Sequence, residues 1–312
     1  MSQIALCVDL APAQHRRLAD AVGNELLVDL TGECIREDAV PESFKRSEIA
    51  FGNPPASWLV GAEGLRWVQL ESVGFGEYMD LDWQQLQGRL TLTNLAGFFA
   101  EPVAETALAG LLSLSRGIDR LTMLKSKGQW EGDPIRTRLR LLHRRHVVLV
   151  GYGAINRKLA DLLAPFECRI DVIRSDSPTE TLDAALVTAE IVVCAAPDTV
   201  STRQMFDARR LALLPETALF ANLGRGSLVD ETALVDALRQ HRLAGAVLDV
   251  TQAEPLPQDH PLWDCPNTLL TQHSGGGTDD ELDRKIDVFL ANLDRYRRNE
   301  RLQGVIDIKR GY

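Results

Sequence analysis

The chain has 312 residues, of which 45% are hydrophobic and 25% charged, and its formal net charge is −10. This length predicts two domains rather than one compact core, and the acidic balance argues against a nucleic-acid surface, which needs a concentrated basic patch. No apolar run approaches the roughly 20 residues that cross a membrane, and the N-terminal sequence lacks the features of a signal peptide. We therefore expect a cytoplasmic protein that binds neither nucleic acid nor membrane.

The cysteines are five in number and none has CxxC spacing. An odd, dispersed set is typical of reduced thiols rather than of a disulfide scaffold or a zinc site. Cys7, Cys168 and Cys194 lie in or beside apolar runs, where a thiol usually acts as a small core residue. We assign the cysteines no chemistry and expect no metal site.

The first hundred residues contain short apolar runs typical of strands, at residues 3–9, 25–30, 48–52 and 66–72. The stretch 101–121 then predicts one long helix whose apolar residues extend well round its circumference, as in a helix buried between domains or subunits. The basic stretch 136–146 has apolar residues interleaved. We interpret it as a connecting or subunit-contact arm, and the alternative is a nucleic-acid patch.

The second half of the chain alternates short apolar strands with amphipathic helices. Strands are expected at 146–150, 169–173, 190–194, 218–223, 245–250 and 268–272, and helices at 156–166, 177–189 and 230–241. Near-continuous apolar strands separated by helices predict a parallel sheet covered on both faces, which is a doubly wound α/β domain. A last helical stretch, 279–299, leaves this domain.

The sequence VVLVGYGAIN, residues 147–156, is typical of a strand that turns into a helix through a glycine-rich loop. Such a loop lets backbone N–H groups approach a pyrophosphate, whose charge the helix N-terminus favours. Gly151 supplies the tight turn and Gly153 the close approach, but Asn156 stands where a third small residue is expected. From the loop alone, a dinucleotide site and an ordinary strand-to-helix turn both remain open.

Three ionisable residues follow three of the predicted strands. Arg225 lies between two glycines, Glu254 precedes a proline-punctuated loop, and His273 precedes three glycines. In isolation each has an ordinary structural interpretation. Because ligands bind at the carboxyl ends of the strands of an open α/β sheet, the three side chains could converge on one crevice. Guanidinium, carboxylate and imidazole together indicate substrate binding combined with acid–base chemistry.

The motifs, taken in order from TNLAGFFAEPVAETALAGLLSLSR to PLWDCPNTLLTQHSGG, strongly resemble the D-isomer-specific 2-hydroxyacid dehydrogenase family, and its glyoxylate and hydroxypyruvate reductases in particular. NLGRGSLVDETALVDAL resembles the arginine signature of the family, LDVTQAEPLP its glutamate signature and TQHSGG its histidine signature. The resemblance covers nearly the whole chain and is looser before residue 60. It favours a dinucleotide site at residues 147–156.

The resemblance implies a catalytic role for each member of the arginine, glutamate and histidine triad. Arg225 would bind the substrate carboxylate and polarise its 2-oxo group. His273 would donate a proton to the carbonyl oxygen as hydride arrives from the nicotinamide. Glu254 would orient that imidazole and favour its protonated form, because a nearby negative charge stabilises the cation.

The resemblance also implies binding residues outside the triad. In ESVGFGE, residues 71–77, the backbone N–H groups around Val73 and Gly74 would hold the substrate carboxylate together with Arg225 and His273; the alternative is a plain strand-end turn. Asp249 matches the position that meets the nicotinamide carboxamide. The other cofactor contacts that we expect are Gly151, Gly153, Ala154, Ile155, Arg174, Ser175, Pro197 and Gly275.

The choice of cofactor depends on Arg174, at the end of a predicted strand where NAD-using relatives commonly carry an aspartate. An acidic residue there binds the ribose 2′-hydroxyl, whereas an arginine accommodates a 2′-phosphate. Arg174, with the Ser175 hydroxyl as a second donor, therefore favours NADP over NAD. Two alternatives weaken this preference: Asp176 could pair with Arg174, or Arg174 could stack on the adenine.

The resemblance implies a Rossmann cofactor domain over residues 101–286 and a smaller flavodoxin-like α/β substrate domain, formed by residues 1–100 and a return segment, 287–312. The activity expected is that of an NAD(P)-dependent 2-hydroxyacid dehydrogenase, or 2-oxo acid reductase, acting as a homodimer. Glyoxylate and hydroxypyruvate are the favoured substrates, because bulky Phe75 would stand near the entrance and no basic cluster for a phosphate is evident. The alternatives are a longer or phosphorylated 2-hydroxy acid, and a nucleotide-sensing, corepressor-like protein without catalysis.

Overall fold

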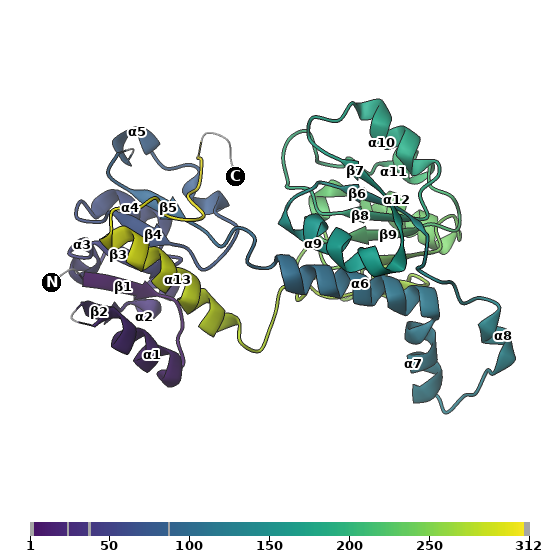
Figure 1. Cartoon of the computed structure of the whole chain (residues 1–312), viewed down its shortest axis with the longest axis horizontal. Helices are drawn as coiled ribbons and strands as arrows, with labels where there is room; N and C mark the ends of the chain where they lie inside the picture. The colour runs from purple at the N-terminus through teal and green to yellow at the C-terminus, as the bar shows by residue number, and fades with distance from the viewer. Residues whose placement is uncertain (1–2, 24, 37–38, 87, 309–312) are drawn as a thin grey trace. The chain divides into compact units, whose positions relative to one another are not determined.

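The computed structural model describes residues 3–23, 25–36, 39–86 and 88–308. The chain divides into two compact units, which are coloured by residue number in Figure 1. Unit 1 comprises Met1–Phe98 and Thr278–Tyr312, and unit 2 comprises Phe99–Gly277. The expected boundary at residue 286 falls inside helix α13 (Glu281–Arg297), which belongs as a whole to unit 1. The boundary lies earlier because this helix packs as one rod on the sheet of unit 1.

Unit 1 is built on a parallel sheet in the order β2-β1-β3-β4-β5. Its strands are β1 (Gln3–Cys7), β2 (Leu26–Asp29), β3 (Ile49–Gly52), β4 (Trp67–Gln69) and β5 (Thr91–Thr93). This strand order is that of the flavodoxin-like fold, as the family resemblance implied. Strand β5 was not predicted, because its sequence Thr-Leu-Thr forms no apolar run.

Both faces of the unit 1 sheet are covered by apolar side chains. On one face, Phe51 and Trp67 pack with Phe289 of α13, and Leu18 of α1 (Pro12–Val22) joins the same cluster. The opposite face packs against Phe44, among other residues of the short helices. These helices are α2 (Thr31–Arg36), α3 (Glu42–Lys45), α4 (Ala56–Gly61), α5 (Trp83–Leu86) and the 3₁₀ helix η1 (Gly76–Tyr78).

Unit 2 is built on a six-stranded parallel sheet in the order β11-β10-β9-β8-β6-β7. The strands are β6 (His146–Val150), β7 (Arg169–Ile173), β8 (Ile191–Cys194), β9 (Leu219–Asn222), β10 (Gly245–Leu248) and β11 (Thr268–Leu270). All six lie where the sequence predicted them. Strand β6 lies between β7 and β8, so the direction in which the chain builds the sheet reverses at β6. Ligands bind at such a switch point, beyond the carboxyl ends of the strands.

Alternate residues of each unit 2 strand serve opposite faces, as expected of a doubly wound sheet. In β6, Val147 and Leu149 join the cluster that includes α6 and α9, whereas Val148 and Val150 join the cluster that includes α10, α11 and α12. The helices are α6 (Ala100–Arg116), α7 (Ile118–Ser126), α8 (Asp133–Arg136), α9 (Ala154–Leu163), α10 (Thr179–Leu186), α11 (Ala208–Leu211) and α12 (Glu231–Arg239). The 3₁₀ helices are η2 (Ala164–Phe166), η3 (Gly226–Leu228) and η4 (Pro261–Asp264).

The prediction of one helix over 101–121 was wrong. Helix α6 ends at Arg116, and Gly117 has a left-handed φ of 64°, from which α7 starts in a new direction (Figure 1). A glycine adopts this conformation without the cost that a side chain adds.

The basic stretch 136–146 returns along unit 2, where Arg140 donates to the Thr217 carbonyl. Among the described residues, no helix combines the length and apolar character needed to span a bilayer.

Candidate active site

The glycine-rich loop forms an open turn between β6 and α9. Gly151 has a φ of 80°, and a Cβ there would lie 2.8 Å from Cα of Ala196, so that only glycine fits. A Cβ on Gly153 would meet nothing within 4 Å. Helix α9 begins at Ala154 without a side-chain cap, so its first-turn N–H groups, including that of Ile155, are available to an anion. This geometry fits the pyrophosphate of a dinucleotide.

Asn156 stands where a third glycine is expected, and its side chain joins α9 to the sheet through hydrogen bonds rather than through close packing. Its side chain is fully buried, and Nδ2 donates to the carbonyl oxygens of Gly151 at 2.6 Å and Val150 at 3.2 Å. Nδ2 also lies 3.4 Å from the Val193 carbonyl oxygen of β8. The altered position therefore fastens α9 to the sheet and leaves the loop above it open.

Arg174 follows β7 and lies over the glycine-rich loop. Its guanidinium carbon is 4.9 Å from the centre of the Tyr152 ring, and its backbone N–H donates to Ser177 Oγ at 3.0 Å. Arg174, Ser175 and Asp176 are all exposed. Across the described part of the chain, no ion pair joins Arg174 to Asp176, so the predicted alternative of such a pair is not seen. The guanidinium keeps its hydrogen-bond donors available at this sheet edge.

The glutamate and the histidine form a direct pair. Nδ1 of His273 lies 2.6 Å from Oε2 of Glu254, while Oε1 of Glu254 accepts a hydrogen bond from the Thr251 N–H at 3.0 Å. Because a carboxylate only accepts, Nδ1 must carry the proton. Nε2 is then the ring nitrogen available to a ligand. Half of the His273 side chain is exposed.

The carboxylate of Glu254 is stabilised in its charged form. Burial raises its pKa, but the hydrogen bonds from His273 and Thr251 and the positive charges of His273 and Arg225 outweigh burial and lower the pKa overall. The positive charge of Arg225 is among the causes that lower the pKa of Glu254, so Arg225 acts electrostatically on the pair. Glu254 is therefore an anion at neutral pH and stabilises a positive charge on the imidazole.

The backbone at His273 is held in an uncommon conformation. Gln272 and His273 have φ values of 54° and 55°, and the His273 N–H donates to the Asp249 carbonyl at 2.6 Å. Consecutive left-handed residues other than glycine cost about 1 kcal/mol each or more. The surrounding structure maintains this geometry at the point where the imidazole meets Glu254.

Asp249 lies beside the pair at the end of β10. It is only 4% exposed, and Oδ1 accepts hydrogen bonds from the Thr271 hydroxyl at 2.6 Å and from the Gly275 N–H at 3.0 Å. Asp249, Glu254 and His273 line one cavity of about 590 Å³. Its other lining residues are Leu248, Thr251, Pro255, Leu256, Trp263, Leu270 and Gln272.

Arg225 follows β9 on a turn that packs against the glutamate loop. The Asn222 side-chain amide donates to the Arg225 carbonyl at 2.9 Å, and the exposed guanidinium donates to the Gly224 carbonyl at 2.6 Å. A Cβ on Gly226 would lie 2.0 Å from the Thr251 carbonyl, so only glycine permits this approach. The structure thus brings the three predicted triad residues to one edge of the unit 2 sheet.

Two contributing residues were not predicted from the sequence. Thr251 positions Glu254 through its N–H, and its hydroxyl donates to the Ala253 carbonyl at 2.8 Å. The sequence Thr-x-x-Glu, typical of a reciprocal backbone and side-chain cap, could have indicated this turn. Tyr152 lies beneath Arg174, and no local pattern indicates that contact.

Pro197, one of the expected cofactor contacts, follows β8 on an exposed turn, where its carbonyl accepts a hydrogen bond from Thr202.

The loop at residues 71–77 in unit 1 presents free backbone donors. Asn94 donates to the Val73 carbonyl at 2.8 Å and Ser72 to the Gly74 carbonyl at 2.7 Å, which fixes the turn. Within the described residues, neither Val73 N–H nor Gly74 N–H makes a hydrogen bond. Phe75 is half-buried against the apolar core of unit 1. Its predicted place near the entrance stays a prediction.

A parallel α/β sheet with an open phosphate loop and a carboxylate–imidazole pair at its strand ends is the arrangement expected of a dinucleotide-dependent oxidoreductase. The sequence profile of the D-isomer specific 2-hydroxyacid dehydrogenase family, NAD binding domain, matches residues 108–275. The chain belongs to this family. It is therefore an NAD(P)-dependent dehydrogenase with its cofactor domain in unit 2.

Named relatives show how broad this family is. The chain is 34% identical over 244 residues to a mitochondrial formate dehydrogenase of Solanum tuberosum, spanning 74% of this chain and 64% of that protein. It is 31% identical to glyoxylate/hydroxypyruvate reductase B of Citrobacter koseri, over 69% of each chain. The crystal structure of a D-isomer specific 2-hydroxyacid dehydrogenase from Xanthobacter autotrophicus in complex with NADPH and MES is 25% identical, with a TM-score of 0.81, over 100% of this chain and 99% of that chain.

Proposed function

We propose that this protein reduces a small 2-oxo acid to the 2-hydroxy acid with a reduced nicotinamide cofactor. The observation that carries the proposal is the 2.6 Å contact between Glu254 and Nδ1 of His273. The contact leaves Nε2 to donate a proton to the carbonyl oxygen, with Glu254 stabilising the protonated ring. Arg225 binds the substrate carboxylate and withdraws charge from the 2-oxo group. The nicotinamide, when bound, supplies the hydride.

The acid–base pair favours a 2-oxo acid over formate. Oxidation of the formate anion to carbon dioxide removes a hydride and moves no proton to or from an oxygen. Reduction of a ketone or aldehyde, in contrast, needs a proton at the carbonyl oxygen as the hydride arrives. A glutamate that accepts from Nδ1 of His273 supports proton donation, which only the second reaction uses.

The residues of unit 2 fit a dinucleotide and favour NADPH. The open space above Gly153 and the uncapped start of α9 suit the pyrophosphate. Exposed Arg174 and Ser175 offer donors for the 2′-phosphate, where an aspartate would repel it. Asp249 would meet the carboxamide through Oδ2, because Oδ1 is already engaged by Thr271 and Gly275.

Glyoxylate and hydroxypyruvate are the substrates that we favour. The free N–H groups of Val73 and Gly74 are suited to a carboxylate. Lys285 contacts this loop through Glu71 and also pairs with Glu281, so it is engaged before any substrate phosphate arrives. The likeness to a glyoxylate/hydroxypyruvate reductase agrees with this assignment. The second candidate is a longer or phosphorylated 2-oxo acid.

The deciding experiment is a panel of glyoxylate, hydroxypyruvate, longer and phosphorylated 2-oxo acids, assayed with NADH and with NADPH, together with formate and NAD(P)⁺. We expect the highest kcat/KM for a small unphosphorylated acid with NADPH. A higher kcat/KM for a phosphorylated acid would favour the second candidate. Turnover of formate alone would refute the proposal, and cofactor binding without any turnover would indicate a nucleotide sensor.

We also propose that the protein is a homodimer. Helix α7 and the segment after it expose apolar side chains that monomers usually bury, among them Ile118 at 52%, Met123 at 56% and Trp130 at 96% exposure. Contact with a second copy would cover them. Light scattering at micromolar concentration should give twice the mass of 34.5 kDa; a monomeric mass would contradict the proposal.

A further inference from the structure

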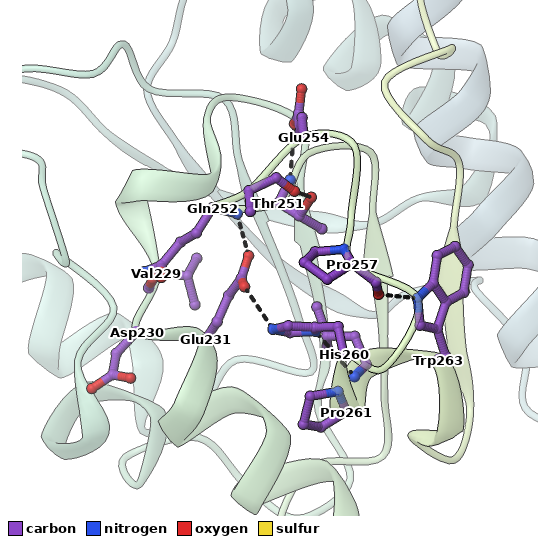
Figure 2. Close-up of polar contacts among 12 residues, drawn as sticks. Val229, Asp230, Glu231, Thr251, Gln252, Glu254, Pro257, His260, Pro261 and Trp263 are labelled. Atoms are coloured by element: carbon purple, nitrogen blue, oxygen red, sulfur yellow. Dashed lines mark hydrogen bonds and ion pairs between the residues drawn. The ribbon is translucent and has the colours of Figure 1, made fainter.

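Glu231 is a buried carboxylate outside the triad. It begins helix α12 and is 8% exposed. Figure 2 shows its carboxylate directed at two partners: it accepts a short hydrogen bond from the Gln252 N–H, and its second oxygen lies 3.5 Å from Nε2 of His260. The pKa of Glu231 is raised, mainly by burial and further by the Glu254 charge, although the Gln252 N–H lowers it, as does His260 when its ring is protonated.

His260 lies beside the outer oxygen of Glu231. The Leu262 N–H donates to Nδ1 of His260 at 3.3 Å, so the proton of the neutral ring lies on Nε2, which faces Glu231. His260 also begins the 3₁₀ helix η4, and Trp263 of that helix donates to the Pro257 carbonyl at 2.8 Å. Glu231 therefore joins α12 to both ends of the loop that carries Glu254.

The contact of Glu231 with this loop bears directly on Glu254. Successive N–H groups serve the two carboxylates: that of Thr251 donates to Glu254 and that of Gln252 donates to Glu231. The Gln252 side chain also donates to the Val229 carbonyl at 3.0 Å. The Thr251 N–H and the Gln252 N–H belong to adjacent peptide planes that meet at Thr251 Cα, so fixing the Gln252 N–H limits the Thr251 N–H to the directions that φ and ψ of Thr251 allow.

We propose that Glu231 is a positioning residue that sets the orientation of the Glu254–His273 pair. It fixes the Thr251–Gln252 peptide, the Thr251 N–H then fixes Oε1 of Glu254, and Oε2 is left facing Nδ1 of His273. This inference rests on the acid–base roles proposed for Glu254 and His273. Among the described residues, Arg225 acts electrostatically on Glu254 and Asp249 lines the same cavity as the pair, while His260 faces Glu231.

The test compares two conservative variants of Glu231, one that changes the length of the side chain and one that changes its charge. Glu231→Asp keeps the charge but shortens the side chain by one methylene, so that it withdraws from the Gln252 N–H. Glu231→Gln keeps an oxygen at full reach and removes the charge. We expect Glu231→Asp to lower kcat about 10-fold or more, because small displacements of catalytic groups are costly, with the KM for the cofactor unchanged. Glu231→Gln should remain within about 3-fold of the parent.

The pH dependence provides the readout that a loss of stability would not move. In Glu231→Asp, reduction should fall off at lower pH than in the parent, because Glu254 no longer holds the imidazolium as closely. The matched control is Asp230→Ala, which removes the cap on the Ala233 N–H at 3.0 Å without touching the loop. This control should melt a few degrees lower while its pH profile stays that of the parent.

A second measurement keeps this inference separate from the proposed function. The ring signal of His273 can be followed by NMR against pH in histidine-labelled protein, with His273→Gln giving the assignment. The midpoint of that titration should fall in Glu231→Asp whether or not any substrate is turned over. An unchanged midpoint in Glu231→Asp, or a loss of kcat in Glu231→Gln as large as in Glu231→Asp, would overturn the inference. Absence of turnover in the parent would instead refute the proposed function.

Discussion

Two regions of unit 2 differ in how firmly their functional side chains are held. At the ends of β10 and β11, both oxygens of Glu254 and the backbone of His273 have protein partners within 3.0 Å. At the end of β7, the guanidinium of Arg174 is exposed and lies over the Tyr152 ring, with its donors available. Proton transfer needs a fixed geometry, whereas a phosphate can be bound by a side chain that adapts. Glu254 and His273 are therefore fixed by protein contacts, whereas the Arg174 guanidinium keeps its donors for a ligand.

The largest expected effect comes from the rigid region. His273→Gln removes the proton donor, so kcat for 2-oxo acid reduction should fall roughly 100-fold or more, the usual scale of general acid catalysis. Cofactor affinity, measured by fluorescence titration of NADPH, should change little. A variant with near-normal kcat would remove His273 from the mechanism.

The adaptable region should show its effect in selectivity rather than in turnover. Arg174→Asp replaces a donor for the 2′-phosphate with a charge that repels it. The ratio of kcat/KM for NADPH to that for NADH should fall about 10- to 150-fold, corresponding to about 1.5 to 3 kcal/mol for a charged hydrogen bond. The measurement is the ratio in parent and variant, with kcat at saturating NADH as the control. A parent that already prefers NADH would contradict the role given to Arg174.

The pH profile sharpens the description of the rigid region. The lowered pKa of Glu254 means that the carboxylate stays ionised to lower pH than a free glutamate, and its charge favours the protonated imidazole. Reduction consumes that proton, so activity declines as pH rises and the ring becomes neutral. Glu254→Gln removes the charge and should move this decline to lower pH. A kcat profile that coincides with that of the parent would show that the pair does not act together.

The smallest expected effect concerns the ring beneath Arg174. A cation over an aromatic face at an exposed site contributes about 0.5 to 1 kcal/mol. Tyr152→Ala should therefore reduce the NADPH/NADH preference only about 2- to 5-fold, whereas Tyr152→Phe, which keeps the ring, should preserve it. If Tyr152→Ala and Tyr152→Phe give the same ratio, the stacking contact has no part in selectivity.

Much of the fold could be predicted because strand signals are local. Each unit 2 strand is a short run of mostly apolar or β-branched residues, and each was confirmed at its predicted place. Helix 101–121 was predicted wrongly because the apolar pattern continues past Gly117, and only the left-handed backbone there shows the break. Strand β5 escaped prediction because Thr91–Thr93 has two threonines around a single leucine and so forms no apolar run.

The candidate site was predictable only in part, for a related reason. Arg225, Glu254 and His273 follow parallel strands of one sheet, so topology alone brings them to a common edge; their catalytic roles stay predictions. The contacts of Glu231 with the glutamate loop depend on how α12 packs, and no spacing in the sequence specifies that packing. Side-chain contacts across separate elements become visible only in three dimensions.

The left-handed backbone at Gln272 and His273 has a consequence for protein engineering. In a library selected for thermal stability alone, glycine and asparagine should become enriched at position 272, because they adopt this conformation at less cost than glutamine. In a library selected for turnover, histidine should persist at position 273 despite the same cost. Two neighbouring codons with one backbone geometry would thus diverge under two selections, and deep sequencing of both libraries would separate the demands of folding from those of chemistry.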